Sequence, residues 1–251
     1  WSSDVCSSDL ACYTYFCKSR NDFEKSDDKS RKYAFKVNTE KWINYVPEDQ
    51  MHKKWGSEFD KYYSKIKEAV DSVFGEVIED EGNLILAAYH AISSGKTEKS
   101  SDVFGGDLKY LTNVESPGDK FASGYETTVD ITFEKFKEVA SNKWNDCDFS
   151  DIPENWIKDI SRTEGGMVKE INIASHKAKG IEIREMFGLR SSDFYVDCDK
   201  DGGKFIFKVL GYGHGVGMSQ CGAQYMAKQG ADYKKILEWY YPNTAVVSLN
   251  K

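Results

Sequence analysis

The side chains of this 251-residue chain that are best suited to chemistry gather in the stretch KVLGYGHGVGMSQCGAQYMAKQG, residues 208–230. Glycine stands at every second position from 211 to 217 around His214, and Ser219 and Gln220 follow where a helix is predicted to begin. Bare backbone lets a ligand approach closely, and these three side chains offer hydrogen-bond donors and acceptors. Because the groups are polar but uncharged, they suit a carbohydrate better than a phosphate.

Two alternatives compete with this interpretation. A phosphate-binding loop also runs from strand through glycines to a helix N-terminus. However, no Lys-Ser/Thr pair follows the last glycine, the spacing is not G-x-G-x-x-G, and only about 30 residues remain for the rest of a dinucleotide domain. The other alternative stays open: the glycines let a strand pack tightly against a helix, and His214 is a core residue.

Composition narrows the class of protein. Hydrophobic residues make up 40% of the chain and charged residues 30%, which is typical of a folded globular domain. The net charge of −7 argues against a nucleic-acid binder, which needs a basic face for phosphates. The longest apolar run, LILAAYHAI, is far shorter than the roughly 20 residues of a membrane span. Scattered cysteines and isolated histidines predict neither a disulfide framework nor a metal site.

The first ten residues, WSSDVCSSDL, are set apart from the rest. They look like the translation of a sequencing adapter and precede a helix-like stretch that begins at Ala11. We therefore expect residues 1–10 to be an assembly scar and exclude them from fold reasoning. Residues 11–251 are then the domain, and we expect the natural protein to continue upstream with a membrane anchor.

The predicted elements mix helices and strands. A helix is expected to end near residue 20, and a charged linker follows over residues 21–32. A further helix is predicted to be capped by Asp49, interrupted at Gly56 and ended by Gly75, with an apolar stripe of Tyr62, Ile66, Ala69, Val70 and Val73. The other predicted elements are a hairpin around EDEGN, a strand TTVDITF followed by a helix from Thr132, strands on both sides of Gly165-Gly166, a short helix Ile181–Phe187, a strand KFIFKVL, and helices capped by Ser219 and Asp232. Without a regular βαβ rhythm, this order predicts an α+β fold: a mixed, largely antiparallel sheet with flanking helices and a substrate cleft.

Three blocks of the chain, in order, resemble the stage II sporulation protein D and LytB (amidase enhancer) family. They are LILAAYHAISSGKTEKSSDVFGGDLKYLTNVESPGDK, GIEIREMFGLRSSDF with its R-x-x-x-G-L-x-S pattern, and GHGVGMSQCGAQYMAKQGADYKKILEWYYPNTAV. The likeness runs from about Ala11 to Asn250.

The resemblance implies an activity. The sporulation branch cleaves peptidoglycan glycan strands between N-acetylmuramic acid and N-acetylglucosamine without water, leaving a 1,6-anhydro sugar. One carboxyl suffices as general acid and then general base, unlike the two carboxylates of ordinary glycosidases. The family glutamate falls upstream of Ala11, so this chain is expected to lack its catalytic acid and to be inactive. Tyr13 stands where the family usually has arginine, and KVNTEKWINYVPEDQ lacks the zinc ligands of some relatives, so no cofactor is implied.

The resemblance also implies a substrate groove. Six residues match its polar or signature positions and are predicted to bind substrate: Thr97, Tyr110, Asp119, His214, Ser219 and Gln220. Structural roles remain open for three of them, since Thr97 and Asp119 suit turns and Tyr110 suits a core. His90 is expected to pack within its strand, and Glu98 and Glu115 are expected to be solvated.

The sequence therefore predicts a peptidoglycan lytic transglycosylase of the sporulation type. The alternative is a non-catalytic, peptidoglycan-binding amidase enhancer. The implied partners are glycan strands, with a cell-wall amidase and a membrane protein of the sporulation machinery as further candidates, and no nucleic acid. The implied location is extracytoplasmic, at the cell envelope.

Overall fold

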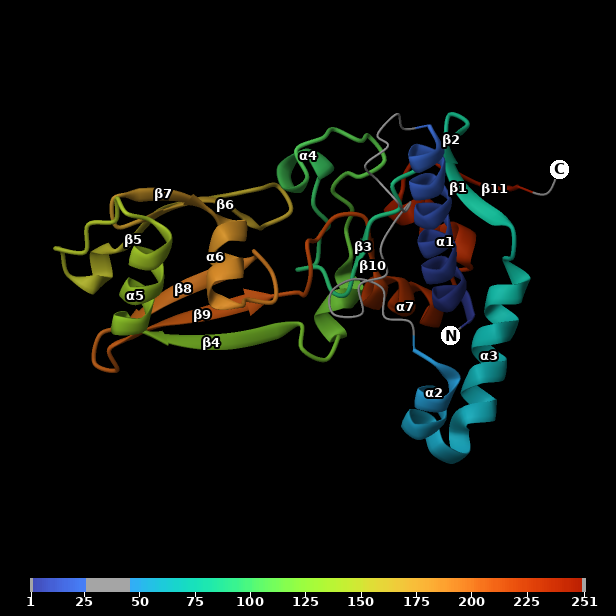
Figure 1. Ribbon diagram of the computed structural model, residues 1–251, viewed down its shortest axis with the longest axis horizontal. Coiled ribbons are helices and arrows are strands. Elements are labelled where there is room, and N and C mark those ends of the chain that lie inside the picture. Colours follow the sequence, from blue (N-terminus) through green and yellow to red (C-terminus); the bar gives the residue numbers. More distant parts are fainter. Residues whose placement is uncertain (1, 26–45, 250–251) are drawn as a thin grey trace. The chain divides into compact units, whose positions relative to one another are not determined.

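A computed structural model describes residues 2–25 and 46–249 of the chain (Figure 1). The chain divides into two compact units. Unit 1 comprises Trp1–Ala88 and Met226–Lys251, and unit 2 comprises Tyr89–Tyr225. Most of the predicted linker, and the greater part of the segment compared with zinc-binding relatives, lie outside the described residues.

Unit 1 pairs helices with a small antiparallel sheet. In its strand order β11-β1-β2, Val77 lies opposite Val247. Helix α1 packs against α3, α8 and strand β1. The elements of this unit are α1 (Ser2–Glu24), α2 (Glu48–Trp55), α3 (Phe59–Ser72), β1 (Glu76–Asp80), β2 (Asn83–Leu84), α8 (Tyr233–Tyr240) and β11 (Ala245–Ser248).

Helix α1 contains most of the ten residues that were set apart in the sequence. Cys6 and Leu10 are buried, and the Cys6 thiol donates to the carbonyl of Ala69 in α3 at 3.3 Å. The helix also runs to Glu24, past its predicted end near residue 20. The origin of residues 1–10 as a scar stays a prediction.

The break between α2 and α3 is confirmed at Gly56, which adopts φ +51. The predicted cap at Asp49 is wrong, because α2 begins at Glu48 after Pro47 and has no side-chain cap. The predicted apolar stripe of α3 is partly exposed: Ala69 is buried, but Ile66 is 41% exposed. The spacing of apolar residues predicted where this helix lies in the sequence, but not how deeply it is buried.

Unit 2 contains two antiparallel three-stranded sheets, β4-β9-β8 and β5-β6-β7. Helix α6 packs on β6 and β7, and α5 packs on β4 (Figure 1). A single apolar core takes side chains from both sheets and both helices, including Phe136, Ile171, Ile183 and Phe207. The elements are β4 (Glu126–Thr132), α5 (Phe133–Lys143), β5 (Ile157–Arg162), β6 (Val168–Ile173), β7 (His176–Lys179), α6 (Gly180–Phe187), β8 (Phe194–Asp199) and β9 (Lys204–Leu210).

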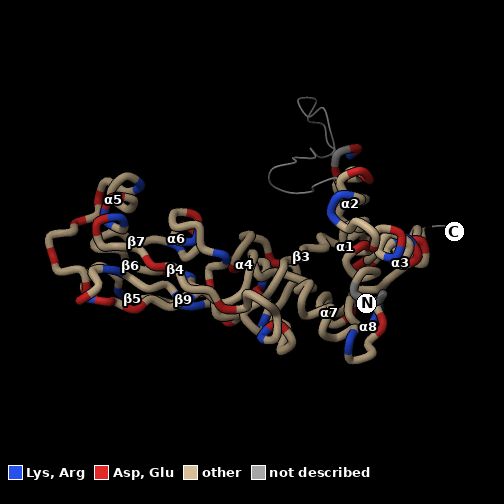
Figure 2. Tube along the Cα trace, turned by 90° about the horizontal axis from the view of Figure 1, so that it is seen from below, with Lys and Arg blue, Asp and Glu red and all other residues tan. Residues whose placement is uncertain are grey.

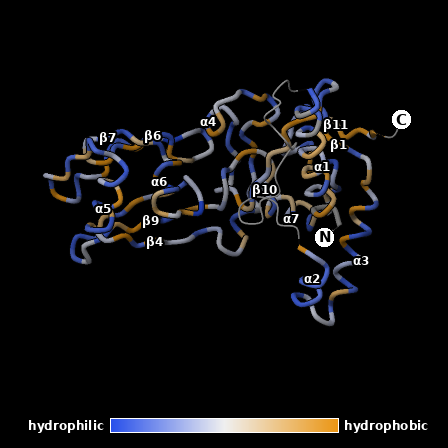
Figure 3. Tube along the Cα trace, in the orientation of Figure 1, coloured by the Kyte–Doolittle hydropathy of each residue, from blue (hydrophilic) through white to orange (hydrophobic). Residues whose placement is uncertain are grey.

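Local signals account for several of these elements. Hydrophobic residues recur along β9 (Figure 3), where Phe205, Phe207 and Val209 alternate into the core. The helix predicted from Thr132 is confirmed, and Thr132 caps α5 by accepting a hydrogen bond from the Lys135 amide at 3.2 Å. The turn at Gly165-Gly166 separates β5 from β6, also as predicted.

The rest of unit 2 is a block of loops tied together by short elements. Strands β3 (Tyr89–His90) and β10 (Met218–Ser219) pair in parallel, and α4 (Ser100–Val103) and a 3₁₀ helix (Pro117–Phe121) lie between β3 and β4 in the chain. Helix α7 (Gln220–Lys228) follows β10. The α+β class is confirmed, although the described strands form several small sheets instead of one, with one parallel pair among them.

Candidate functional site

The alternating glycines of residues 211–217 all adopt positive φ, between +72° and +121°. An added Cβ at Gly211 would lie 2.7 Å from the Ile92 carbonyl oxygen, and one at Gly213 would lie 2.7 Å from the His90 Cβ. One at Gly215 would meet Met167 at 2.7 Å and Glu98 at 3.0 Å. The space on the Cβ side of these three glycines is therefore filled by the protein itself. Close approach of a ligand to this backbone stays a prediction.

Asp119 is the centre of a buried hydrogen-bond network. Its carboxylate accepts hydrogen bonds from the Ser93 amide at 2.9 Å, from the Ser93 hydroxyl, and from the Ser219 hydroxyl at 2.7 Å. Ser219 in turn accepts from the Gly222 amide at 3.2 Å, which caps α7 as predicted. Burial raises the pKa of Asp119, and these hydrogen bonds oppose the rise. The network joins three segments far apart in sequence.

Thr97 is fully buried, and hydrogen bonds to one neighbouring segment of the chain satisfy its polar groups. Its hydroxyl donates to the Thr112 carbonyl at 2.9 Å and accepts from the Val114 amide at 2.8 Å. The Asn113 side chain donates to the Thr97 carbonyl at 2.6 Å. These contacts hold the loop that carries the next residue, Glu98.

Glu98 corrects the expectation of a solvated carboxylate, because its side chain is 1% exposed. Its Oε1 accepts hydrogen bonds from the Thr163 hydroxyl at 2.8 Å and the Met167 amide at 3.0 Å. Its Oε2 is buried without a hydrogen-bond partner among the described residues. Burial raises the pKa of Glu98. Glu115, by contrast, is exposed as expected.

The Gly165-Gly166 turn makes room for two buried carboxyl groups. A Cβ at Gly165 would overlap the Glu98 carboxyl, and one at Gly166 would lie 2.7 Å from Oδ2 of Asp193. Asp193 is 3% exposed and forms an ion pair with Arg162 at 3.3 Å. The glycine pair, which the sequence marked as a turn between strands, thus has a second role in housing these acids.

His214 and His90 lie near each other, with ring centroids 5.8 Å apart. The His214 Nδ1 accepts from the Val216 amide at 3.2 Å, and its ring also bonds to the Tyr89 backbone. The His90 Nδ1 donates to the Val216 carbonyl at 3.2 Å. Burial lowers the pKa of His214 to about 4 and that of His90 to about 3. Both imidazoles are therefore neutral at pH 7.

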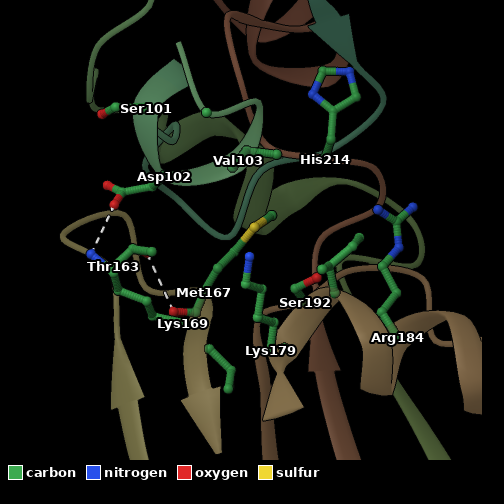
Figure 4. A pocket seen from close by; sticks show the side chains of 14 residues that line it. Ser101, Asp102, Val103, Thr163, Met167, Lys169, Lys179, Arg184, Ser192 and His214 are labelled. Carbon is green, nitrogen blue, oxygen red and sulfur yellow. Dashed lines mark hydrogen bonds and ion pairs between the residues drawn. The ribbon is translucent and has the colours of Figure 1, made fainter. Parts of the chain in front are cut away.

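A cavity of about 210 Å³ opens beside His214 within unit 2 (Figure 4). It is bounded by α4 and Gly105, which follows that helix, by the β5–β6 turn, by the start of α6, and by the loop before β8. In it, Lys169 pairs with Asp102 at 3.2 Å. The polar and charged side chains that line it are Ser101, Asp102, Thr163, Lys169, Lys179, Arg184, Ser192 and His214.

Of the six predicted site residues, His214 lines this cavity. Asp119 and Ser219 meet in the buried network, Thr97 braces the Glu98 loop, and Tyr110 is buried at 7% exposure. Gln220 is exposed at the first residue of α7. Contact of these residues with a substrate stays a prediction.

The cavity residues Arg184, Lys179 and Ser192 were missed. A signal for Arg184 was present, since it is the arginine of the R-x-x-x-G-L-x-S pattern in the second matching block. Ser192 is in the same block, in RSSDF. Lys179 carries no comparable signal, because exposed lysines are common at strand ends. Pairing between β7 and β6 brings it to the cavity.

Metal and membrane features were searched in the described part of the chain. No group of three or more His, Cys, Asp or Glu side chains there has the arrangement of a metal site. None of the helices in residues 2–25 and 46–249 combines the length and apolarity required to cross a bilayer.

Comparison with known proteins identifies the family. The chain is 33% identical over 217 residues to stage II sporulation protein D of Bacillus amyloliquefaciens, covering 86% of this chain and 60% of that protein. It is 31% identical over 202 residues to stage II sporulation protein D of Bacillus subtilis, covering 80% of this chain and 57% of the relative. The amidase enhancer of Bacillus subtilis is 28% identical over 232 residues, covering 74% of this chain and 33% of the relative.

The chain belongs to the stage II sporulation protein D and amidase enhancer family. It spans about 60% of the length of the first of these relatives. No family model matches the chain. Membership relates the protein to the cell wall and the cell envelope.

Proposed function

We propose that the intact protein is a peptidoglycan lytic transglycosylase that cleaves N-acetylmuramic acid–N-acetylglucosamine strands and leaves 1,6-anhydro ends. The observation that carries the proposal is the 33% identity to a stage II sporulation protein D over 86% of this chain. The proposed partner is the glycan strand, and the proposed site of action is the cell wall.

The carboxyl groups of unit 2 support a separation between the residues that bind glycan and the general acid. Burial raises the pKa of Glu98, Asp119 and Asp193, as a general acid requires. Each is nearly inaccessible, however, and each carboxyl accepts hydrogen bonds from neighbouring groups. A proton donor must reach the glycosidic oxygen within hydrogen-bond distance. We therefore propose that unit 2 binds glycan and that the general acid is the family glutamate, which the resemblance places before Ala11.

Analysis of the products tests this proposal. Isolated cell walls are digested with the 251-residue chain and, in parallel, with the stage II sporulation protein D of Bacillus subtilis, and the fragments are identified by mass spectrometry. We expect 1,6-anhydromuramic ends from the relative and binding without cleavage by this chain. Cleavage by the chain at the rate of the relative would contradict the proposed separation between the glycan-binding residues and the general acid. Fragments with reducing ends would contradict the reaction type.

The amidase enhancer among the relatives supports a second candidate function. In this alternative the protein binds peptidoglycan and stimulates a separate wall amidase without cutting the glycan. The two functions differ in what is released: an amidase frees stem peptides, whereas a transglycosylase shortens the glycan. A purified amidase assayed with and without the chain distinguishes them. Faster peptide release with no new glycan ends would favour the enhancer.

A further inference from the structure

Tyr212, in the middle of the glycine segment, is a half-exposed aromatic residue on a fixed backbone. Its amide donates to the Ile92 carbonyl at 2.7 Å, and its carbonyl accepts from the Ile92 amide at 3.1 Å. The amides of both flanking glycines also donate to other segments, at 2.7 and 3.0 Å. The side chain is nevertheless 46% exposed. These hydrogen bonds therefore fix the backbone that presents the ring at the surface of unit 2.

A guanidinium group lies over the Tyr212 ring. The Cζ of Arg190 is 4.3 Å from the ring centroid, and a Cβ added at Gly124 would lie 2.6 Å from its Nη1. The guanidinium therefore contacts both Gly124 and the ring. A cation over an aromatic face is attracted to it. This contact favours one orientation of the ring.

Arg190 has no acidic partner to compete with the ring. Basic and acidic positions are interspersed along the strands of unit 2 (Figure 2), where Lys208, for example, pairs with Glu126 at 3.0 Å. No ion pair joins Arg190 to an acidic side chain in residues 2–25 or 46–249. The contact with Tyr212 is therefore the main interaction of its charge within the described part of the chain.

A second arginine–tyrosine pair in unit 2 shows the contrast. The Cζ of Arg162 lies 4.1 Å from the ring centroid of Tyr195, which is 49% exposed. However, Arg162 also pairs with Asp193 at 3.3 Å and donates to two backbone carbonyls at 2.7 Å each. Internal contacts account for the position of Arg162. They do not account for that of Arg190, whose contacts hold a ring at the surface.

Tyr212 lies beside the cavity of about 210 Å³. Burial lowers the pKa of Arg184, a lining residue, and the nearby side chains of Glu185 and Tyr212 oppose that effect. His214, two residues further along the chain, lines the same cavity. A flat aromatic surface thus stands next to a largely polar lining. A sugar ring has the matching shape, since it combines an apolar C–H face with an edge of hydroxyl groups.

We propose that Tyr212 is a stacking platform for one sugar ring of a glycan strand and that Arg190 positions the aromatic ring. This inference rests on the proposed function, which supplies the strand, and it adds a residue outside the six predicted ones. The C–H face of the sugar packs on the electron-rich face of tyrosine. Because the ring is held before the ligand arrives, little freedom is lost on binding. The platform requires no charge on the ligand.

Binding of an uncharged oligosaccharide tests the platform. The 251-residue chain is titrated with chitohexaose by calorimetry. We expect Tyr212→Ala to weaken binding about 10-fold, and Tyr212→Phe to bind as the wild type does, because the aromatic face remains. Tyr195→Ala is the matched control. It removes an equally exposed ring that also contacts a guanidinium but does not line the cavity, and it should leave the affinity unchanged.

A double-mutant cycle tests the positioning role of Arg190. Arg190→Gln should weaken chitohexaose binding about threefold in the wild-type background. It should have no effect in the Tyr212→Ala background, because a positioning residue acts only through the ring. Equal weakening in both backgrounds would show that Arg190 affects binding by another route and would overturn this role.

The remaining outcomes separate the platform from the proposed function. Binding by the wild type that Tyr212→Ala leaves unchanged would overturn the platform and leave the proposed function standing. No binding of chitohexaose by the wild type would contradict both the platform and the binding of glycan by unit 2. Equal losses in Tyr212→Ala and Tyr195→Ala would show a general effect of removing surface rings and would also overturn the platform. Thermal unfolding of each variant verifies that it is folded.

Discussion

Glu98 illustrates how far the role of one side chain can lie from its appearance in the sequence. Within GKTEKSSD it looks like one of several solvated charges. Its burial depends on Gly165, which is distant in sequence and leaves room for the carboxyl, and on Thr163 and Met167, which donate to it. Because contacts of this range carry no local signal, the sequence alone could not have distinguished Glu98 from Glu115.

Replacing Glu98 by glutamine should make the protein more stable than the wild type at high pH. Burial raises the pKa of Glu98 above its ordinary value of 4.5. The stability that the neutral carboxyl supports is present below pH 4.5 and is lost as the pH rises through the raised pKa. Glutamine keeps the oxygen that accepts from Thr163 and Met167 and never ionises. We expect the melting temperature of Glu98→Gln, relative to wild type, to increase from pH 4 to pH 8.

The exposed Glu115→Gln provides the control for this comparison, since its carboxyl lies on the surface. A difference between Glu98→Gln and wild type that stays constant with pH would show that the buried carboxyl is not the source of the effect.

His90 should make the fold sensitive to acid in the opposite sense. Burial lowers its pKa from 6.5 to about 3, so its neutral form supports the fold above pH 6.5 and that support is lost as the pH falls toward 3. From pH 6.5 to pH 4 this amounts to about 3 kcal/mol in the free energy of unfolding. His90→Asn keeps a donor for the Val216 carbonyl without a titrating ring. Its deficit relative to wild type should shrink over this range in urea unfolding.

His52→Asn is the matched control, because His52 lies on the exposed helix α2 with a side chain 54% exposed. If the wild type and His90→Asn lose stability in parallel between pH 6.5 and pH 4, the buried histidine does not cause the acid sensitivity.

At the scale of elements, the glycine segment of residues 211–217, where the sequence predicted a binding site, packs closely against neighbouring parts of the chain. Its positive φ angles and close neighbours let residues 211–217 run directly against His90 in β3 and against the loop residues Ile92 and Glu98. Tight packing, one part of the alternative that the sequence left open, is confirmed, but the close neighbours are β3 and loops instead of a helix, and His214 lines a cavity. The segment also borders the cavity of unit 2 through His214.

Gly211→Ala should therefore destabilise the protein far more than Gly188→Ala. Both glycines have positive φ, +77° and +63°, so both variants incur the conformational cost of about 1–2 kcal/mol. At Gly188 no atom lies within 4 Å of the added Cβ, whereas at Gly211 it meets the backbone of Ile92 and Ser93. We expect a total of about 4 kcal/mol for Gly211→Ala. Chemical denaturation measures both, and equal losses would refute the packing role.

Element boundaries were predictable where a local device sets them. The helix start at Thr132, the Asp232 cap, the Gly56 break and the Gly165-Gly166 turn were all found at their predicted places. The cavity was not predictable in the same way, because Ser192, Lys179 and Arg184 come together through strand pairing and the packing of α6 on β6 and β7. The periodicity of hydrophobic residues predicts a helix or a strand, but not which of these elements pack against each other.

At the scale of the whole molecule, unit 2 is an uninterrupted stretch of chain between the two segments of unit 1. Its apolar core, the Asp119 network and the cavity are all formed within residues 89–225. An inserted segment with its own core satisfies the usual conditions for independent folding. This division was not predictable from composition, since no linker-like stretch marks residue 88 or residue 226.

A fragment of residues 89–228, which extends unit 2 to the end of α7, should fold by itself and retain the cavity. Folding is expected because the hydrogen bonds that Asp119 accepts from Ser93 and Ser219 do not require unit 1. A dispersed amide spectrum and a single cooperative thermal transition would establish the fold, with Phe136→Ala in the core as a destabilised control. A titration with a GlcNAc-MurNAc tetrasaccharide should then give an affinity within about threefold of the full chain, since about 0.6 kcal/mol separates the two binding free energies at that limit. A disordered fragment would show that the core of unit 2 depends on the rest of the chain. A folded fragment without glycan affinity would show that the recognition of glycan requires residues of unit 1.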